Sequence, residues 1–450
     1  MTEQPPRPTP ASTASAQPDR SAFGGPIGGV AMMICLPLLS VYLWVCIHRF
    51  DGALVLPDLD LLAQLPAPNL SSLLYLSGWF AFQLALDLYL PGRVYLNQPQ
   101  RDGRRLTYRL NGLASLCVTL LALGVLLATG LVSGASTLAQ LGPLLITAII
   151  VAYLLSLFLY VYGKRYRPEG DVRPQVGQLA VQPDGSASVV ASGPVNLAHV
   201  AYDYFMGTAL NPRIGRLDLK MFCESKIGMT SWIVLTLLMA HAEYQISGAL
   251  SLAMLLVCLF QLVYVVDFFW FEEAMLSTWD INNENYGFML AFGFTVWMPF
   301  NFSLQAQYLV HNTPHVPGWL AALLVLLNFA GYFVFRTSNL QKHRFRTVPG
   351  AKIWGREPSF IQTQRGTRLL TAGWWGIARH SNYFGDLLMA LAWCIPCGFS
   401  HITPYFYFIY FAPLLIDRER RDDRHCARKY GGDWVRYCTA VKYRIVPFLY

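Results

Sequence analysis

The chain has 450 residues, of which 54% are hydrophobic and only 13% are Asp, Glu, Lys or Arg. Soluble domains carry about 25% charged residues, so this composition excludes a soluble globular protein and requires a surface that faces lipid. The net charge of +8 comes from basic residues that lie between apolar segments. A nucleic-acid-binding protein would instead gather them on one face with interleaved aromatic residues, so we expect no nucleic-acid partner.

The N-terminal segment is rich in Pro, Ser, Thr, Ala and Gln and has almost no large apolar side chains. Such a composition cannot build a core, and we predict a disordered cytoplasmic tail over residues 1–26. The apolar segment that follows is too long for a secretory signal and lacks a clear small-residue cleavage site. It is therefore predicted to be a retained first helix, opening a membrane domain over residues 27–450.

Crossing the hydrocarbon core of a bilayer takes about 20 apolar residues. The sequence thus predicts an all-α, polytopic integral membrane protein with about ten transmembrane helices. In the longest loop, an alternating segment that starts at Leu179 predicts a small hairpin. The predicted spans are 27–47, 71–90, 111–133, 141–162, 229–246, 248–270, 286–310, 317–336, 380–399 and 401–417.

The distribution of Lys and Arg between the spans predicts their orientation, because cytoplasmic loops are enriched in both residues. With the tail in the cytoplasm, basic loops follow the second, fourth and eighth spans, and the C-terminal segment is basic as well. The loops after the third, seventh and ninth spans contain neither residue. The loop after the sixth span is acidic, so it neither supports nor contradicts this orientation of the spans. Both termini are predicted to be cytoplasmic.

Ionisable groups at membrane depth are costly and usually functional. One cluster, at the end of the sixth span, contains Tyr264 and Asp267 and continues to Glu272. In a second cluster, polar residues recur at helical spacing and predict one stripe that faces a cavity or a partner rather than lipid. The alternative for both clusters is a set of buried ion pairs that join helices. The stripe consists of Arg379, Asn382, Tyr383 and Asp386.

The segment 417–430 follows an apolar helix directly and is dense in Arg with interspersed Asp. A solvated helix face would explain this composition. The same array also suits an anionic, ring-bearing ligand, because Arg binds phosphate in a bidentate manner and Trp and Tyr offer stacking faces. Neither a G-x-G-x-x-G motif after a strand nor a P-loop is present. Any dinucleotide would therefore be bound without a Rossmann domain.

Several motifs closely resemble the sterol reductase family, which includes delta-14 sterol reductase, the membrane part of lamin B receptor and 7-dehydrocholesterol reductase. The resemblance covers nearly the whole membrane region and is closest to bacterial-type delta-14 sterol reductases. One departure is Asn283-Glu284, where family members commonly have His-Asp; the missing His puts a proton relay at that point in doubt. The motifs are 211–215, 264–267, 335–342, 373–383, 404–407, 421–423, 429–431, 433–434 and 443–444.

The resemblance implies NADPH-dependent reduction of a sterol ring double bond, with the delta-14 bond preferred over the delta-7 bond. It implies a sterol that enters from the bilayer, a cofactor site mostly within residues 338–450, and no metal. The host membrane would be the bacterial inner membrane or the endoplasmic reticulum, and the oligomeric state stays open. The implied cofactor contacts are Lys342, Arg346, Leu370, Trp375, Asn382, Tyr383, Asp422, Cys426, Ala427, Arg428, Lys429, Tyr430 and Tyr437.

Hydride does not add readily to an isolated, electron-rich alkene, so the implied reaction needs a general acid in a pocket that excludes water. Our hypothesis for the acid is Tyr264 or Asp267, coupled to Glu272, with Tyr437 as a second tyrosine candidate. A membrane methyltransferase of the isoprenylcysteine type is a competing enzyme hypothesis. A sterol-binding scaffold without catalytic activity is the non-enzyme hypothesis.

Overall fold

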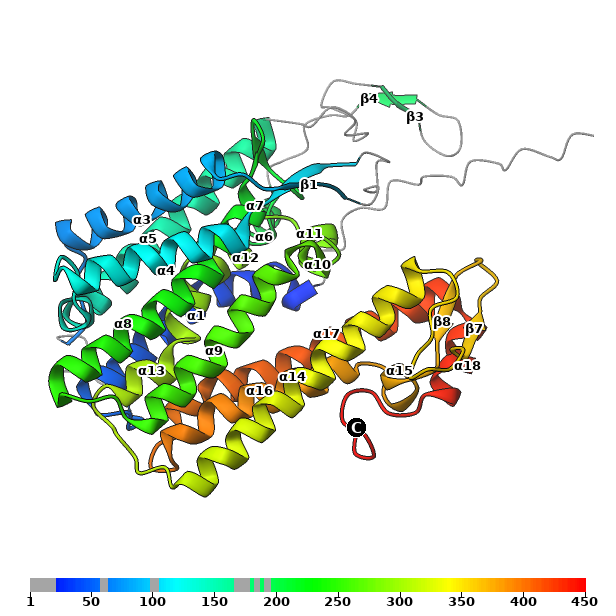
Figure 1. Cartoon of the computed structure of the whole chain (residues 1–450). Coiled ribbons are helices and arrows are strands. Elements are labelled where there is room, and N and C mark those ends of the chain that lie inside the picture. Colours follow the sequence, from blue (N-terminus) through cyan, green and yellow to red (C-terminus); the bar gives the residue numbers. More distant parts are fainter. Residues whose placement is uncertain (1–21, 57–63, 98–104, 166–178, 182–186, 190–195) are drawn as a thin grey trace, which may run out of the picture.

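The computed structural model describes residues 22–56, 64–97, 105–165, 179–181, 187–189 and 196–450. Long helices lie side by side in a bundle, and a smaller C-terminal lobe extends from one end of it (Figure 1). The long helices are α1 (Gly25–Arg49), α3 (Leu70–Tyr89), α4 (Gly112–Ala128), α5 (Gly134–Arg165), α8 (Thr230–Ser247), α9 (Leu252–Trp270), α14 (Gly318–Thr347), α16 (Ser381–Cys394) and α17 (Phe406–Tyr430).

Within the part of the chain that the structure describes, five helical segments are long and apolar enough to cross a membrane. The other predicted spans also fall on helices, but these are shorter, interrupted or less apolar, so the total of about ten remains a prediction. The span predicted at 286–310 illustrates an interruption: it divides into α12 (Phe288–Phe292), a π-helical segment (Gly293–Asn301) and α13 (Leu304–Leu309). The five segments are Ala22–Arg49, Gly134–Arg165, Leu219–Ser247, Leu252–Trp270 and Gly318–Thr347.

The first helix begins earlier than the sequence predicted. A 3-10 turn over Ala22–Gly24 leads into α1, which starts at Gly25 and carries Pro26 in its first turn. Proline suits this position because its fixed φ matches the helix and its missing N–H would have no partner there. The rest of the predicted tail, residues 1–21, lies outside the described residues.

The structure is mostly helical, as predicted, and its described residues also form four two-stranded antiparallel sheets. The hairpin predicted from Leu179 is confirmed as β3–β4, whereas the other three were not predicted because their strands are too short for a period of two to be visible. The pairs are β1 (Arg93–Leu96) with β2 (Thr107–Leu110), β3 (Leu179–Val181) with β4 (Ala187–Val189), β5 (Arg213–Ile214) with β6 (Leu217–Asp218), and β7 (Phe360–Gln362) with β8 (Arg368–Leu370).

Short helices fill the junctions between the long ones. A continuous helical rod runs through α7 (Leu219–Phe222) and a π-helical segment (Cys223–Met229) into α8. The remaining short helices are α6 (Leu197–Met206), α10 (Glu272–Met275), α11 (Trp279–Asn283), α15 (Trp374–Ile377) and α18 (Gly432–Ala440), with 3-10 turns at Ile395–Cys397 and Thr403–Tyr405.

The C-terminal lobe combines the ends of α14 and α17 with β7, β8, α15 and α18 (Figure 1). Both long helices continue from their apolar parts into charged parts, and the charged parts lie within this lobe. The lobe therefore falls within residues 338–450, where the resemblance places most of the cofactor site.

Candidate active site

The lobe is held together by contacts between its hairpin and its last helix. Asp433, in the first turn of α18, accepts a hydrogen bond of 2.8 Å from the backbone amide of Gln364 in the β7–β8 turn. Trp434 and Tyr437 of α18 pack against Ile361 and Leu369 of the hairpin. The hairpin is thus fixed beside the charged half of α17.

At the centre of the lobe, a cation lies over an indole ring. Trp375 is buried, and its Nε1 donates a hydrogen bond of 2.7 Å to the carbonyl of Ser338 on α14. Lys342, one turn further along α14, places its Nζ 3.9 Å from the centre of the Trp375 ring. Leu370 and Phe345 pack in the same apolar cluster. The cluster fixes the indole, and a cation–π contact holds the ammonium against its face.

Two further predicted residues act on the Lys342 ammonium through their charges. The charges of Arg346 and Asp422 both act on it, the first from the next turn of α14 and the second from α17. His380 lies 3.7 Å from the Asp422 carboxylate through its Nε2 and stacks on Tyr383, with ring centres 4.8 Å apart and planes inclined by 14°. Residues from α14, α16 and α17 thus meet at one place.

Asn382 joins this group with an unsatisfied acceptor. Its Oδ1 is buried and has no hydrogen-bond partner among the residues that the structure describes. A buried polar atom without a partner costs free energy unless a ligand or water supplies the missing bond. The atom therefore marks a position where a ligand could donate a hydrogen bond.

The predicted polar stripe needs a correction at its first member. Helix α16 begins at Ser381, so Arg379 lies before the helix and does not share a face with the other three residues. Its backbone amide donates to the carbonyl of Tyr443, and its Nη1 donates to Asp423 Oδ1 at 3.1 Å and to Cys438 Sγ at 2.9 Å. Arg379 is thus in extended backbone paired with the C-terminal segment, and for this reason it does not continue the helix that its spacing predicted.

The remaining predicted cofactor residues lie at the end of α17 and in α18. Tyr437 stacks on Trp434 at 5.0 Å, and burial raises the pKa of its phenol above the usual value, so the hydroxyl stays neutral. Cys426 and Tyr430 pack beside it. Burial raises the pKa of the Cys426 thiol to about 12. Exposed side chains at the surface of the lobe belong to Arg346, Ala427, Arg428 and Lys429.

The candidate acid Tyr264 lies among aromatic rings. Its ring centre is 5.3 Å from that of Trp393 and 5.8 Å from that of Trp232. Its hydroxyl has no hydrogen-bond partner within the described part of the chain. This environment suits a neutral phenol that would donate its proton only to a ligand.

Asp267 is already committed to two partners on α14. The Arg336 guanidinium makes two contacts with it, of which Nε to Oδ1 measures 2.9 Å, and the Tyr332 hydroxyl donates to the same oxygen at 2.8 Å. These contacts make Asp267 a bridge between α9 and α14. Arg336 was not predicted as the partner of Asp267. It is one of the few basic residues outside the basic loops, and this isolated position could have indicated a buried ion pair.

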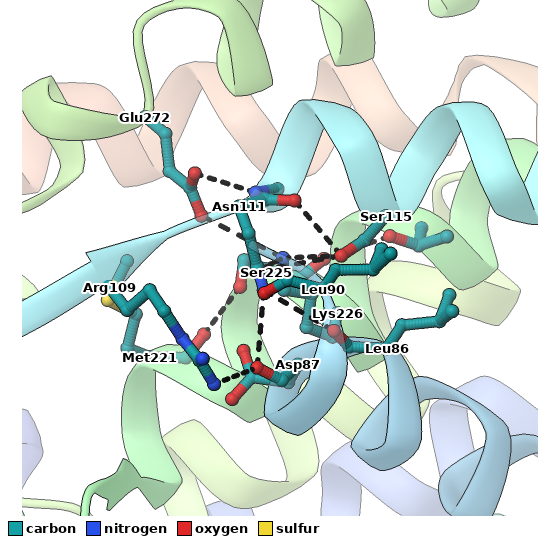
Figure 2. Close-up of polar contacts among 12 residues, drawn as sticks. Leu86, Asp87, Leu90, Arg109, Asn111, Ser115, Met221, Ser225, Lys226 and Glu272 are labelled. Atoms are coloured by element: carbon teal, nitrogen blue, oxygen red, sulfur yellow. Dashed lines mark hydrogen bonds and ion pairs between the residues drawn. The ribbon is translucent and has the colours of Figure 1, made fainter. Parts of the chain in front are cut away.

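Glu272 makes its contacts with residues other than the two remaining candidate catalytic residues. On α10, its Oε2 accepts a hydrogen bond of 2.8 Å from the amide of Gly112, and its Oε1 is 3.9 Å from the Nζ of Lys226 (Figure 2). Burial raises the pKa of the Glu272 carboxyl, and the ammonium of Lys226 opposes that shift. No hydrogen bond or ion pair links it to Tyr264 or Asp267 in the described residues, and its predicted coupling to either of them stays a prediction.

These features define a polytopic helical membrane protein that carries a cationic, aromatic-lined site in a C-terminal lobe. Residues 18–450 match the ergosterol biosynthesis ERG4/ERG24 family, and the chain belongs to this family of sterol reductases.

Relatives from bacteria and animals share nearly the whole chain. A Delta(14)-sterol reductase of Methylotuvimicrobium alcaliphilum is 42% identical over 96% of this chain and 96% of its own length. The Delta(14)-sterol reductase TM7SF2 of Mus musculus is 40% identical over 95% of this chain and 97% of its own length. The Delta(14)-sterol reductase LBR of Gallus gallus is 40% identical over 94% of this chain but only 63% of its own length.

Proposed function

We propose that the protein reduces the delta-14 double bond of a sterol with NADPH, by protonation followed by hydride transfer. Its membership of a sterol reductase family supports the reaction class, and the relatives named above carry the delta-14 activity in their names. The observation that carries the cofactor proposal is the Lys342 ammonium over the buried face of Trp375, within reach of Arg346.

The residues of the lobe fit the chemistry of NADPH. Its phosphates would be bound by Lys342 and Arg346, which offer charge-assisted hydrogen bonds, and an amide N–H would satisfy the buried Oδ1 of Asn382. Tyr383, which stacks on His380 with one face, would offer its other face to a flat ring. When bound, NADPH would supply the hydride.

The chain itself would supply the proton and the apolar surroundings. We assign the proton to the hydroxyl of Tyr264, which lies among aromatic rings and has no competing acceptor in the described residues. Those rings would exclude water from the carbocation and stabilise it through their faces. Asp267 would act as a positioning residue, because its ion pair with Arg336 fixes α9 against α14 beside the tyrosine.

The decisive experiment uses the purified full chain in lipid nanodiscs with a sterol that carries a 14,15 double bond. We expect oxidation of NADPH that depends on the sterol, with a product two mass units heavier, and rescue of a strain lacking delta-14 reductase. Reduction of only a delta-7 bond would overturn the proposal that the delta-14 bond is the one reduced. Sterol binding without oxidation would identify a scaffold, and binding of S-adenosylmethionine instead of NADPH would identify a methyltransferase.

A further inference from the structure

A tight turn between α14 and β7 holds a tryptophan in a strained backbone conformation. In this turn, residues 353–356, the amide of Ile353 donates to the carbonyl of Arg356 at 2.9 Å, and the Arg356 amide donates back at 3.1 Å. The central residues Trp354 and Gly355 have φ angles of 50° and 76°. Positive φ at both is typical of a type I′ turn, in which Asn, Asp or Gly is preferred at the first position. A bulky side chain there costs free energy.

The 353–356 turn is anchored on one side and open on the other. Ile353 is buried and packs with Phe345, Leu370 and Trp375 in the apolar cluster of the candidate active site. Trp354, the next residue, keeps 60% of its surface exposed. The turn therefore directs an indole away from the interior of the lobe. Packing within the lobe does not explain why a tryptophan occupies the strained position.

The exposed indole continues the lipid-facing surface of α14. Its ring centre lies 5.6 Å from that of Trp374, and the Trp374 ring centre lies 6.5 Å from that of Phe333 on α14, with both pairs edge to face. Phe333 is itself exposed, and α14 is one of the helices that can cross a membrane. The three rings thus lead from the membrane span to the turn. The exposed apolar side chains on this face of α14 are Leu323, Leu326, Phe329 and Phe333.

The length of α14 gives the depth of these rings in the bilayer. Trp319, in the first turn of α14, is 71% exposed, and tryptophan is enriched where a bilayer meets water. The hydrocarbon core is about 30 Å thick and a helix rises about 1.5 Å per residue. About 20 residues beyond Trp319, α14 therefore reaches the opposite interface, close to Thr337. Trp374 donates a hydrogen bond of 2.8 Å from its Nε1 to the Thr337 hydroxyl, which places Trp374 and Trp354 at that interface.

Two cations flank the exposed indole. Lys352 and Arg356 lie two residues before and two residues after Trp354, and both are exposed. Neither side chain forms an ion pair in the described part of the chain. Glu357 is the only carboxylate of the segment 348–358, so the segment is positively charged. Tryptophan beside basic residues suits the headgroup region of a membrane whose surface is anionic.

We propose that the 353–356 turn docks on the headgroup region of the surrounding bilayer and binds anionic phospholipids there. The indole of Trp354 would lie among the headgroups, and Lys352 and Arg356 would contact their phosphates. Because Ile353 packs on Trp375, the docked turn would also hold the cofactor lobe against the membrane surface. The proposal concerns where the lobe rests, and it does not depend on the reaction that the protein carries out.

The test is fluorine NMR of the full chain labelled with 5-fluorotryptophan, in nanodiscs of phosphatidylcholine and phosphatidylglycerol in equal amounts. W354F identifies the Trp354 resonance by its loss. We expect that resonance to broaden with a phospholipid that carries a nitroxide on its headgroup, and to broaden little with a gadolinium chelate dissolved in the water. The resonance of Trp434, which is buried in the same lobe and identified with W434F, should broaden less with the lipid label.

Spin-labelled phosphatidylglycerol and phosphatidylcholine then report the role of the two cations. K352Q and R356Q should each lower the local enrichment of phosphatidylglycerol at Trp354 by up to about fivefold, the effect of one basic residue near an anionic surface. The control R365Q, which changes an exposed cation in the β7–β8 turn, should leave the enrichment unchanged. Melting temperatures verify that every variant is folded.

Two results would overturn the proposal. A Trp354 resonance that broadens with the gadolinium chelate but not with the lipid label would show that the turn lies in water, and one that broadens with neither would show that something other than lipid covers it. An unchanged enrichment of phosphatidylglycerol in the folded double variant K352Q/R356Q would show that the turn does not select anionic lipid.

Discussion

Arg444 binds both oxygens of the buried Glu419 carboxylate, at 3.0 and 2.9 Å from its Nη1. The pair ties the C-terminal segment to α17. The carbonyl of Arg444 also accepts the amide of His380, directly before α16. The C-terminal residues therefore position the start of the helix that carries Asn382 and Tyr383.

From this relationship we expect R444M to weaken cofactor binding. Loss of the pair would leave Glu419 buried without its cation and loosen the start of α16, raising the KM for NADPH about tenfold with a smaller change in kcat. Steady-state kinetics at saturating sterol measures both. K442M, which changes a neighbouring exposed cation, serves as the control. An unchanged KM in R444M would contradict this role.

K342M should raise the KM for NADPH by about tenfold or more. The substitution removes a charge-assisted hydrogen bond to phosphate and the cation over Trp375. NADPH titration followed by tryptophan fluorescence measures the affinity directly. R344M, two residues further along α14 and exposed, should bind NADPH as the wild type does. Equal effects of the two substitutions would indicate only a general loss of positive charge.

Y264F should retain both ligands but lose turnover. A general acid contributes about 10²- to 10⁴-fold to a rate, so we expect kcat to fall at least about a hundredfold. Single-turnover measurements with bound sterol and NADPH separate the chemical step from binding. Y308F removes a hydroxyl that bonds His401 instead, and it should turn over normally. Full turnover by Y264F would transfer the acid role to another residue.

The Asp267–Arg336 ion pair between α9 and α14 predicts that removal of one charge destabilises the protein more than removal of both. R336M leaves Asp267 buried beside Tyr332 alone and should lower the free energy of unfolding by about 3 kcal/mol or more. The double variant D267N/R336M removes both charges, so its free energy of unfolding should fall by less than that of R336M alone. Thermal unfolding in one detergent compares the two variants. A double variant less stable than R336M would contradict the buried ion pair.

Cys426 should react slowly with maleimides near neutral pH. Because its pKa is raised to about 12, mainly by burial and then by the Asp422 charge, the thiolate fraction is smaller than in an unfolded peptide. Alkylation followed by mass spectrometry should accelerate up to about pH 12, and NADPH should slow it. D422N should lower the pKa and speed the reaction. A thiol as reactive as a free peptide cysteine would contradict the buried site.

Local features of the sequence determined the membrane-embedded helices, the family and most members of the candidate site. Apolar length, the spacing of basic loops and contiguous motifs such as 373–383 depend on neighbouring residues, so they are visible without a fold. Of the predicted cofactor residues, Lys342, Leu370 and Trp375 lie together in the structure, whereas Arg428 and Lys429 are exposed at the surface of the lobe.

Only the tertiary structure decided which polar groups meet across distant helices. It paired Asp267 with Arg336, moved Arg379 out of its predicted stripe to Asp423, and bonded Glu272 to the amide of Gly112. The physical reason is that a buried charge must find a partner wherever packing places one. That partner depends on how the helices lie in space, which the spacing of residues along the chain does not specify.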